Sequence, residues 1–273
     1  IHEDCIDLNT ESAVVQKYLI DAYTKYIEMG VDGFRIDTVK HVSRNTFNRR
    51  FLPAFREAGG ENFYMFGEVC TRVNEVWNKG VAPLSTPFYT WKERTNYSAD
   101  DEAAAHEAYA YEQGQGTNNQ PTSDNHYLKG NNYHKPDYSK FSGMAVIDFP
   151  MHWNFSDANS AYGKRGDDKY YNDATWNVVY VDSHDYGPNM DDRYSGGTDA
   201  WAENMTFMWT FRGIPCLYYG SEIEFQAGQK CDKGSIAPLS STGRAYYGDH
   251  IEGSVTATDF GEYSNASGAV KTT

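Results

Sequence analysis

The chain has 273 residues, and its 24 Lys and Arg residues against 38 Asp and Glu residues give a formal net charge of −14. A hydrophobic content of 40% with 23% charged residues is that of a globular protein with a sizeable core, which excludes wholesale disorder. The negative charge disfavours nucleic acids and anionic lipid surfaces as partners, whereas a neutral partner meets no such repulsion. The sequence also has no apolar run long enough for a membrane-spanning helix.

The first part of the chain predicts helices that alternate with strands. Apolar residues at three- and four-residue spacing predict a helix over 9–30, capped by Asn9 or Thr10 and ended by Gly30. The run VDGFRID has β character, a second helix is expected over about 44–58, and FYMFGEV is the next strand. Two strands joined by a helix-length connection indicate parallel βα units.

The periodicity fails over 71–142, where Gly, Asn, Gln, Ser and Tyr predominate. We interpret this stretch as a long insertion that serves a site, with a possible helical patch at 102–111, because long structureless loops are uncommon in compact domains. The alternation then resumes with the strands MAVIDF, VVYVD and IPCLYYG, and with the helix DAWAENMTFMWTFRG. Five strands alternating with helices fit either an open doubly wound sheet or part of a (β/α)8 barrel.

The ends of the strands favour the barrel. The sequence contains no glycine-rich phosphate loop of the kind that doubly wound nucleotide-binding sheets require. Four of the strands end instead in acidic or polar residues, namely Asp37, Glu68, Asp148 and the pair His184 and Asp185. Catalytic groups of barrels come from the carboxyl ends of several strands, so the predicted fold class is α/β, a partial (β/α)8 TIM barrel.

Two of these carboxyl groups are expected to differ in charge. Side chains alternate along a strand, so Arg35 and Asp37 point the same way, and the guanidinium favours the ionised form of the Asp37 carboxyl. Glu68 lies in an apolar, aromatic setting, where burial against Phe66 should raise its pKa. A charged and a protonated carboxyl are what glycoside hydrolysis needs, and Asp185 supplies a third acid. Each acid taken singly is more often structural, but the set on successive strands favours a catalytic site.

Three segments resemble signature regions of the α-amylase family, glycoside hydrolase family 13: GVDGFRIDTVKHV at 30–42, FGEV at 66–69 and VDSHD at 181–185. Weaker support comes from DLN at 7–9, DFP at 148–150 and GIPCLYYGSE at 213–222. The resemblance implies that residues 1–273 form the C-terminal part of a glycosidase catalytic barrel, roughly its strands four to eight. The insertion over 71–142 then follows the second strand of the chain.

The resemblance also implies roles for the acids. Asp37 would be the nucleophile that forms a covalent glycosyl-enzyme, Glu68 the general acid/base, and Asp185 the carboxylate that holds hydroxyl groups of the distorted sugar ring. Arg35 would orient Asp37, and His184 would hydrogen-bond the sugar on the non-reducing side of the scissile bond.

Further substrate and metal contacts are expected around this centre. By the same resemblance, Lys40 and His41 line the acceptor side, and the His41 backbone carbonyl is a ligand of a structural calcium ion whose other ligands lie outside this chain. Trp153 and Tyr186 lie just beyond strand ends, where their rings could stack on glucose.

The implied activity is retaining hydrolysis of α-1,4-glucans such as starch and maltooligosaccharides by an extracellular or cell-surface enzyme. The alternatives are a transglycosylase of the same family, which forms cyclic or elongated products, and a non-catalytic carbohydrate-binding relative. The family's earlier motif with an Asp, an Asn and a His is absent from the sequence, so we expect residues 1–273 alone to be inactive.

The four cysteines show neither a CxxC pair nor a zinc-binding spacing. Cys70 and Cys216 lie in apolar, strand-like runs and are expected to be buried free thiols, whereas the state of Cys5 and Cys231 is left open.

Overall fold

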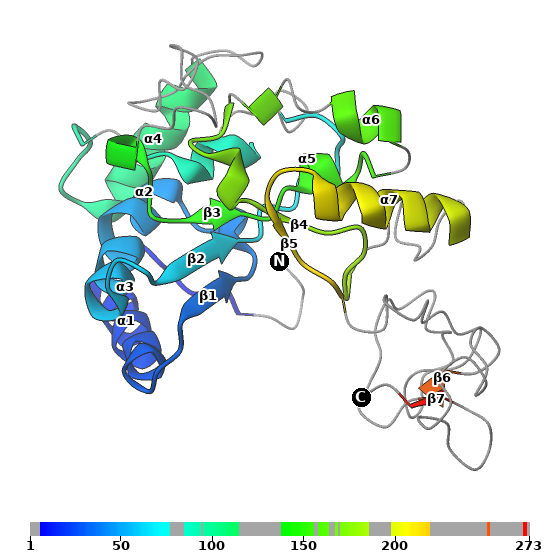
Figure 1. The fold of residues 1–273 in the computed structure, drawn as a ribbon. Helices are drawn as coiled ribbons and strands as arrows, with labels where there is room; N and C mark the ends of the chain where they lie inside the picture. The colour runs from blue at the N-terminus through cyan, green and yellow to red at the C-terminus, as the bar shows by residue number, and fades with distance from the viewer. Residues whose placement is uncertain are drawn as a thin grey trace. The chain divides into compact units, whose positions relative to one another are not determined.

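The computed structural model describes residues 6–76, 85–93, 95–114, 138–155, 158–163, 167–168, 170–185, 198–218, 250–251 and 270–271 (Figure 1). The chain divides into two compact units, one of residues 1–149 and 166–178 and the other of residues 150–165 and 179–273. The first unit carries Asp37 and Glu68, and the second carries Asp185. None of the helices in the described ranges is both long enough and apolar enough to cross a membrane.

A three-stranded parallel sheet forms the centre of the first unit. Its strands, in spatial order, are β1 (Gly33–Ile36), β2 (Tyr64–Gly67) and β3 (Ala145–Val146). The register sets Ile36 opposite Gly67 at the carboxyl ends of β1 and β2. Because both strands run the same way, the residues that follow them meet at one edge of the sheet. The parallel βα prediction is therefore confirmed for these strands.

Helices cover this sheet on the side of α1 (Figure 1). The first unit contains α1 (Ala13–Glu28), α2 (Arg44–Thr46), the π-helical turn η2 (Phe47–Phe51), α3 (Leu52–Gly59) and α4 (Asp101–Gly114). Its 3-10 turns are η1 (Val39–His41), η4 (Thr86–Thr90), η5 (Tyr138–Lys140) and η7 (Ala174–Trp176). From α2 to α3 the helical stretch is continuous, and it matches the helix predicted over 44–58.

The start of α1 differs from the prediction. The helix begins at Ala13, and its N-cap is Ser12, whose side chain makes no capping hydrogen bond. Asn9 instead accepts a hydrogen bond from the backbone N–H of Glu11 at 3.1 Å, so its side chain closes a turn before the helix. The predicted end is confirmed, because Gly30 has a φ of 101°, which a glycine adopts without steric cost.

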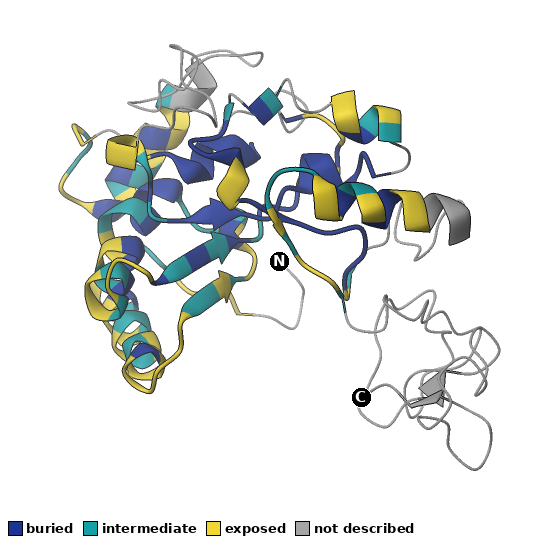
Figure 2. Cartoon of the chain, viewed as in Figure 1, coloured by how far each residue is buried: buried dark blue, intermediate teal, exposed yellow. Residues whose placement is uncertain are grey.

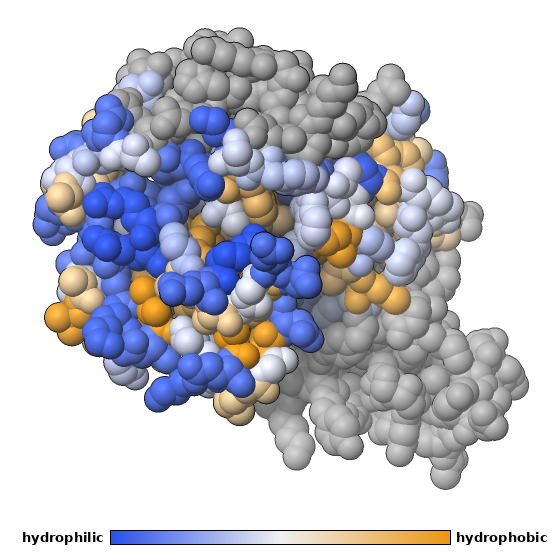
Figure 3. All heavy atoms as spheres, turned by 60° about the vertical axis from the view of Figure 1, so that its left-hand side comes forward, coloured by the Kyte–Doolittle hydropathy of each residue, from blue (hydrophilic) through white to orange (hydrophobic). Residues whose placement is uncertain are grey.

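Aromatic side chains between the helices and the sheet form the core of the first unit. The ring of Phe34 in β1 contacts Phe55 at 5.4 Å and Phe63 at 5.0 Å between centroids, both edge to face. Burial increases from β1 towards β3 (Figure 2). The outer face of α1 is exposed to solvent, and Tyr18 on this helix is 73% exposed. On the side of the molecule drawn in Figure 3, apolar side chains are scattered among polar ones.

Part of the predicted insertion over 71–142 has defined structure. It contains η4, α4 and η5, and Trp91 forms a β-bridge with Phe141. The helical patch expected at 102–111 lies within α4. The Trp91 side chain is 2% exposed and its indole N–H donates to the Tyr170 carbonyl at 2.9 Å. These described segments of the insertion therefore pack into the unit, which composition alone did not predict.

The second unit combines helices with two-residue strands. They are α6 (Ala158–Gly163), α7 (Thr198–Thr210), β5 (Ile214–Pro215), β6 (His250–Ile251) and β7 (Val270–Lys271), while α5 (Phe149–His152) and β4 (Val178–Val179) begin at the boundary with the first unit. β4 pairs with β5, and β6 pairs antiparallel with β7. Phe155 contacts Phe207 of α7 edge to face at 6.1 Å.

The two described cysteines differ in burial. Cys70 is buried, as predicted, but Cys216 is an exposed thiol, so that prediction was wrong. The backbone N–H of Cys216 donates to the Val179 carbonyl at 2.8 Å, but β5 is only two residues long, and the side chain that follows it remains open to solvent. Cys5 and Cys231 lie outside the described residues.

Candidate active site

Asp37 and Glu68 lie side by side at the carboxyl edge of the parallel sheet. Each follows directly on its strand, Asp37 after β1 and Glu68 after β2. The backbone N–H of Glu68 donates to the Ile36 carbonyl at 2.8 Å, and the N–H of Val39 donates to the Glu68 carbonyl at 3.0 Å. The parallel pairing thus extends just past both strands and fixes the spacing of the two acids.

Arg35 contacts both carboxylates. Its guanidinium forms an ion pair with Asp37, and Nη2 lies 3.4 Å from Glu68 Oε2. The side chain of Glu68 is 12% exposed, whereas that of Asp37 is 64% exposed. The predicted pairing of Arg35 with Asp37 is confirmed, and the contact with Glu68 is an addition that depends on the strand register.

The surroundings of Glu68 raise the pKa of its carboxyl above the ordinary value. Burial is the largest cause, and a hydrogen bond with the Asp37 carboxyl together with the charge of Asp37 acts in the same direction. The backbone N–H of Thr38 and the charge of Arg35 lower the pKa and so oppose it. The predicted direction and its main cause are confirmed. The arrangement suits a carboxyl group that holds a proton beside one that is ionised.

Thr38 is a contributor that sequence reasoning missed. Its backbone N–H donates to Glu68 Oε2 at 3.0 Å, and its φ of 48° and ψ of 33° place it in the left-handed region. A threonine is uncommon there, because its branched Cβ crowds the backbone. No signal in the sequence marks this conformation, which glycine or asparagine would have suggested.

Lys40 and His41 lie in η1, directly after this edge. The Lys40 ammonium donates to the Cys70 carbonyl, which links η1 to the segment after β2. His41 is exposed. The described residues contain no group of three His, Cys, Asp or Glu side chains that could hold a metal ion. The calcium expectation therefore depends on the His41 carbonyl alone and stays a prediction.

His184 and Asp185 form a local pair in the second unit. The His184 Nε2 atom lies 3.0 Å from Asp185 Oδ2, and the backbone N–H of Asp185 donates to Ser183 Oγ at 3.1 Å. The convergence of Asp185 with Asp37 and Glu68 in one cleft remains a prediction. Asp148, another strand-end acid, is 1% exposed and accepts a hydrogen bond from the Tyr171 hydroxyl at 3.0 Å, which is a packing role.

The sugar-stacking expectation for Trp153 is not supported by its position. The side chain is only 8% exposed, and its ring contacts His152 at 4.6 Å between centroids. Both faces of a ring in such packing are largely covered, so Trp153 serves as core in this structure. Tyr186, the other predicted stacking residue, lies outside the described residues.

A comparison with protein families identifies the family of this chain. The family model described as the alpha-amylase catalytic domain matches residues 2–250, and the chain therefore belongs to the alpha-amylase family. The α-amylase resemblance seen in the motifs is thereby confirmed.

Several curated proteins are similar to the chain at low identity. A cyclomaltodextrin glucanotransferase of Bacillus sp. (strain 38-2) is 24% identical over 259 residues, which cover 89% of this chain and 27% of that protein. A beta/alpha-amylase of Paenibacillus polymyxa is 24% identical over 237 residues, which cover 81% of this chain and 14% of that protein. The chain thus spans well under half the length of these relatives.

Among solved structures, the chain is similar to the alpha-amylase of Geobacillus thermoleovorans in complex with acarbose. The TM-score is 0.51 at 19% identity, over 82% of this chain and 40% of that chain. A likeness at this level establishes the fold, which is an α/β fold of the TIM-barrel type.

Proposed function

We propose that this chain carries the nucleophile and the general acid/base of a retaining enzyme that hydrolyses α-1,4-glucans such as starch and maltooligosaccharides. The observation that carries the proposal is the adjacency of the Asp37 and Glu68 carboxyls, which both contact the guanidinium of Arg35. Membership of the alpha-amylase family and the names of the relatives support the choice of α-glucan as substrate.

The chemistry follows from the two protonation states. The Asp37 carboxylate attacks the anomeric carbon, while Glu68 gives its proton to the departing glycosidic oxygen, and a covalent glycosyl-enzyme forms. Glu68, now ionised, takes a proton from water, which attacks the same carbon and releases Asp37. Retaining enzymes hold their two carboxyls about 5–5.5 Å apart, whereas inverting enzymes hold them roughly 6.5–9.5 Å apart to admit a water molecule. Two carboxyls that contact the same guanidinium favour the shorter spacing and so the retaining route.

The finer assignments belong to the same proposal. Strands β1 to β5 would be strands four to eight of the barrel, and Asp185 and His184 would join Asp37 and Glu68 when the barrel is complete. A structural calcium ion bound in part by the His41 carbonyl, and an extracellular or cell-surface location, are further proposals on the same basis.

Substitution of the two acids in the full-length protein tests the mechanism. Glu68→Gln cannot donate a proton and should lower kcat on maltoheptaose by about 10²–10⁴-fold, while Asp37→Asn should abolish formation of the intermediate. Asp32→Asn, at an exposed position before β1, is the matched control and should leave kcat unchanged. If either active-site variant retained the wild-type rate, the assignment would be wrong.

The stereochemistry of the first product tests the retaining route separately. Proton NMR of the fresh product should show the α-anomer, because two displacements restore the original configuration. A β-anomer released first would mean that a water attacks directly, and that Asp37 is a base.

Transglycosylation is the second candidate, because several relatives are named cyclomaltodextrin glucanotransferase. Both reactions share the glycosyl-enzyme and differ only in whether water or a sugar hydroxyl reaches it. Cyclic or elongated products from maltoheptaose would identify the transferase, whereas short linear products would identify the hydrolase. Sugar binding without turnover would instead revive the non-catalytic alternative.

A further inference from the structure

A groove runs along the first unit away from the carboxylate edge, by which we mean the sheet edge that holds Asp37 and Glu68. It consists of two cavities of about 550 Å³ and about 320 Å³. The cavities share the lining residues Arg56, Tyr138, Phe141 and Gly143, so they adjoin, and we call them together the outer groove. Both volumes fall in the range of roughly 300–1,000 Å³ that is typical of ligand sites.

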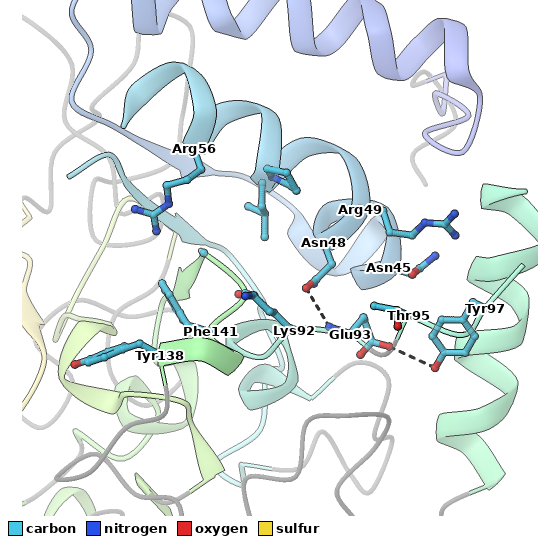
Figure 4. Close-up of a pocket in the computed structure, with 14 residues that line it drawn as sticks. Asn45, Asn48, Arg49, Arg56, Lys92, Glu93, Thr95, Tyr97, Tyr138 and Phe141 are labelled. Carbon is cyan, nitrogen blue, oxygen red and sulfur yellow. Dashed lines mark hydrogen bonds between the residues drawn. The ribbon is translucent and has the colours of Figure 1, made fainter. Parts of the chain in front are cut away.

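The outer groove lies between elements that are far apart in the sequence. In Figure 4 the helical stretch from α2 to α3 forms one wall with Asn48 and Arg56, and the segment with Lys92 and Glu93 lies opposite. The smaller cavity reaches Tyr64, the first residue of β2. Glu68 follows the other end of β2, so the outer groove and the carboxylate edge lie at opposite ends of the same strand. Neither Asp37 nor Glu68 lines either cavity.

Exposed aromatic rings line the groove, where Tyr138 is held by a hydrogen bond and Trp176 by its backbone and a ring contact with Tyr64. Tyr138 is 57% exposed and Trp176 is 46% exposed. The Tyr138 hydroxyl donates to Asp173 at 2.6 Å, and the Tyr64 hydroxyl donates to the Trp176 carbonyl. The rings of Tyr64 and Trp176 lie 5.9 Å apart between centroids. Rings that are fixed and still exposed lose little conformational entropy when a flat apolar face stacks on them.

The charges in the groove are balanced. The lining contains three cations and three acids: Arg49, Arg56, Lys92, Glu61, Glu93 and Asp173. Most are already occupied, since Arg49 donates to the Ser98 carbonyl at 2.8 Å, Arg56 donates to the Glu61 carbonyl at 2.6 Å, and Glu93 forms an ion pair with Arg44 at 3.1 Å. A lining without net charge favours a neutral ligand over a polyanion.

Asn45 adds an amide donor and an amide acceptor to the lining of the larger cavity. It is 1% exposed, and neither its amide nitrogen nor its amide oxygen has a hydrogen-bond partner among the described residues. Buried amides are normally satisfied, because leaving one without a partner costs about 1–3 kcal/mol. A ligand that carries adjacent hydroxyl groups can accept from the nitrogen and donate to the oxygen.

We propose that the outer groove is a second, non-catalytic binding site for a linear α-glucan. A glucan chain is neutral, carries hydroxyl groups along its edges and presents apolar C–H faces, which match Asn45, the balanced charges and the rings of Tyr138 and Trp176. The choice of glucan rests on the proposed function, because the bound chain would be the polysaccharide that the carboxylate edge cleaves. Binding there would hold the enzyme on an insoluble substrate and raise the local concentration of cleavable chains.

Hydroxyl-radical footprinting with mass spectrometry locates the bound sugar directly. The full-length protein with Glu68→Gln is used, so that maltoheptaose is not consumed. Saturating maltoheptaose should slow the oxidation of Trp176 and Tyr138 several-fold, while Trp209 of α7, which is 53% exposed and does not line the groove, keeps its rate. Unchanged rates at Trp176 and Tyr138 would overturn the proposal, as would protection by dextran sulfate but not by maltoheptaose.

Variants of the rings test the consequence for catalysis. Trp176→Ala and Tyr138→Ala should lower the rate on starch granules about 3- to 10-fold and leave the rate on maltotriose unchanged, because the short substrate does not span both sites. Tyr138→Phe keeps the ring and should retain the granule rate, as should the matched control Trp209→Ala. Near-UV circular dichroism verifies that each variant is folded. Equal granule rates in all variants would overturn the proposal.

The two proposals fail in distinguishable ways. If Glu68→Gln kept full activity, the catalytic assignment would be wrong, and protection of Trp176 by maltoheptaose would still support the outer groove. If Glu68→Gln were inactive and Trp176 stayed unprotected, the mechanism would stand and the second site would not.

Discussion

The backbone N–H of Thr38 donates to the side chain of Glu68 across the β1–β2 pair, at 3.0 Å. Thr38 adopts the left-handed conformation where it makes this bond, and burial and the charge of Asp37 raise the pKa of the same glutamate. The N–H favours the ionised form of Glu68 and thus limits the rise in pKa that burial causes. The residue after the candidate nucleophile therefore positions the candidate acid.

We expect Thr38→Gly to keep the site intact and Thr38→Pro to destroy it. Glycine adopts a φ of 48° without steric cost and retains the N–H, so the free energy of unfolding should change by no more than about 1 kcal/mol. Proline has no N–H and a φ fixed near −65°, so it should lower stability by about 3 kcal/mol or more. Urea unfolding measures both variants. A glycine variant less stable than the proline variant would contradict the role of the turn.

Glu68→Gln should stabilise the protein at neutral pH and much less in acid. The raised pKa means that the folded protein holds this proton more tightly than the unfolded chain does. Its contribution to stability is complete below the unfolded pKa and is lost as pH rises through the folded pKa. Glutamine does not titrate, so its advantage over glutamate should grow as the pH rises from about 4, where an unfolded glutamate titrates, to neutral pH. Urea unfolding across this range is the measurement.

The control for that pH dependence is Glu57→Gln on the exposed side of α3. This variant should change the free energy of unfolding by less than about 0.5 kcal/mol both in acid and at neutral pH. A stability gain for Glu68→Gln that was larger in acid than at neutral pH would reverse the sign and refute the assignment.

Gly67→Ala should destabilise the first unit. A Cβ at this position would lie 2.8 Å from Val39 Cγ2 and 2.9 Å from Met144 Sδ, and both of these side chains are buried. Overpacking of this kind costs about 1–3 kcal/mol. Gly163→Ala in α6 meets no atom within 4 Å and should be neutral or stabilising by up to about 1 kcal/mol. Thermal unfolding measures the stability of both variants. A loss of stability in Gly163→Ala but not in Gly67→Ala would contradict the prediction.

The buried ion pair between Arg44 and Glu93 should matter more than an exposed one. Its side chains are 6% and 2% exposed, and the two charges lie 3.1 Å apart. Glu93→Gln leaves the Arg44 guanidinium buried with a weaker partner and should lower the free energy of unfolding by about 3–5 kcal/mol. Asp21→Asn breaks the pair with Lys17, whose side chains are 75% and 55% exposed, and should change it by less than about 1 kcal/mol. Denaturant titration measures the free energy of unfolding of both variants. Equal losses in the two variants would mean that burial does not strengthen the ion pair.

Local patterns predicted the regular elements well. Three- and four-residue spacing of apolar side chains located α1, the helical stretch from α2 to α3, and α7, because one face of each helix is buried. The same reasoning missed the packing of Trp91, which depends on contact with Phe141, fifty residues further along the chain. It also placed Cys216 inside, because an apolar run does not reveal that β5 is only two residues long.

The sequence by itself determined the family, the pairing of Arg35 with Asp37, and the presence of an acid after β2. These follow from motifs and from the alternation of side chains along one strand, which are local properties. Only the tertiary structure decided that Arg35 also reaches Glu68, that Thr38 donates to it, and that Tyr64, Tyr138 and Trp176 line one groove. These contacts depend on strand register and on the packing of segments distant in sequence, and neither can be read from the order of residues alone.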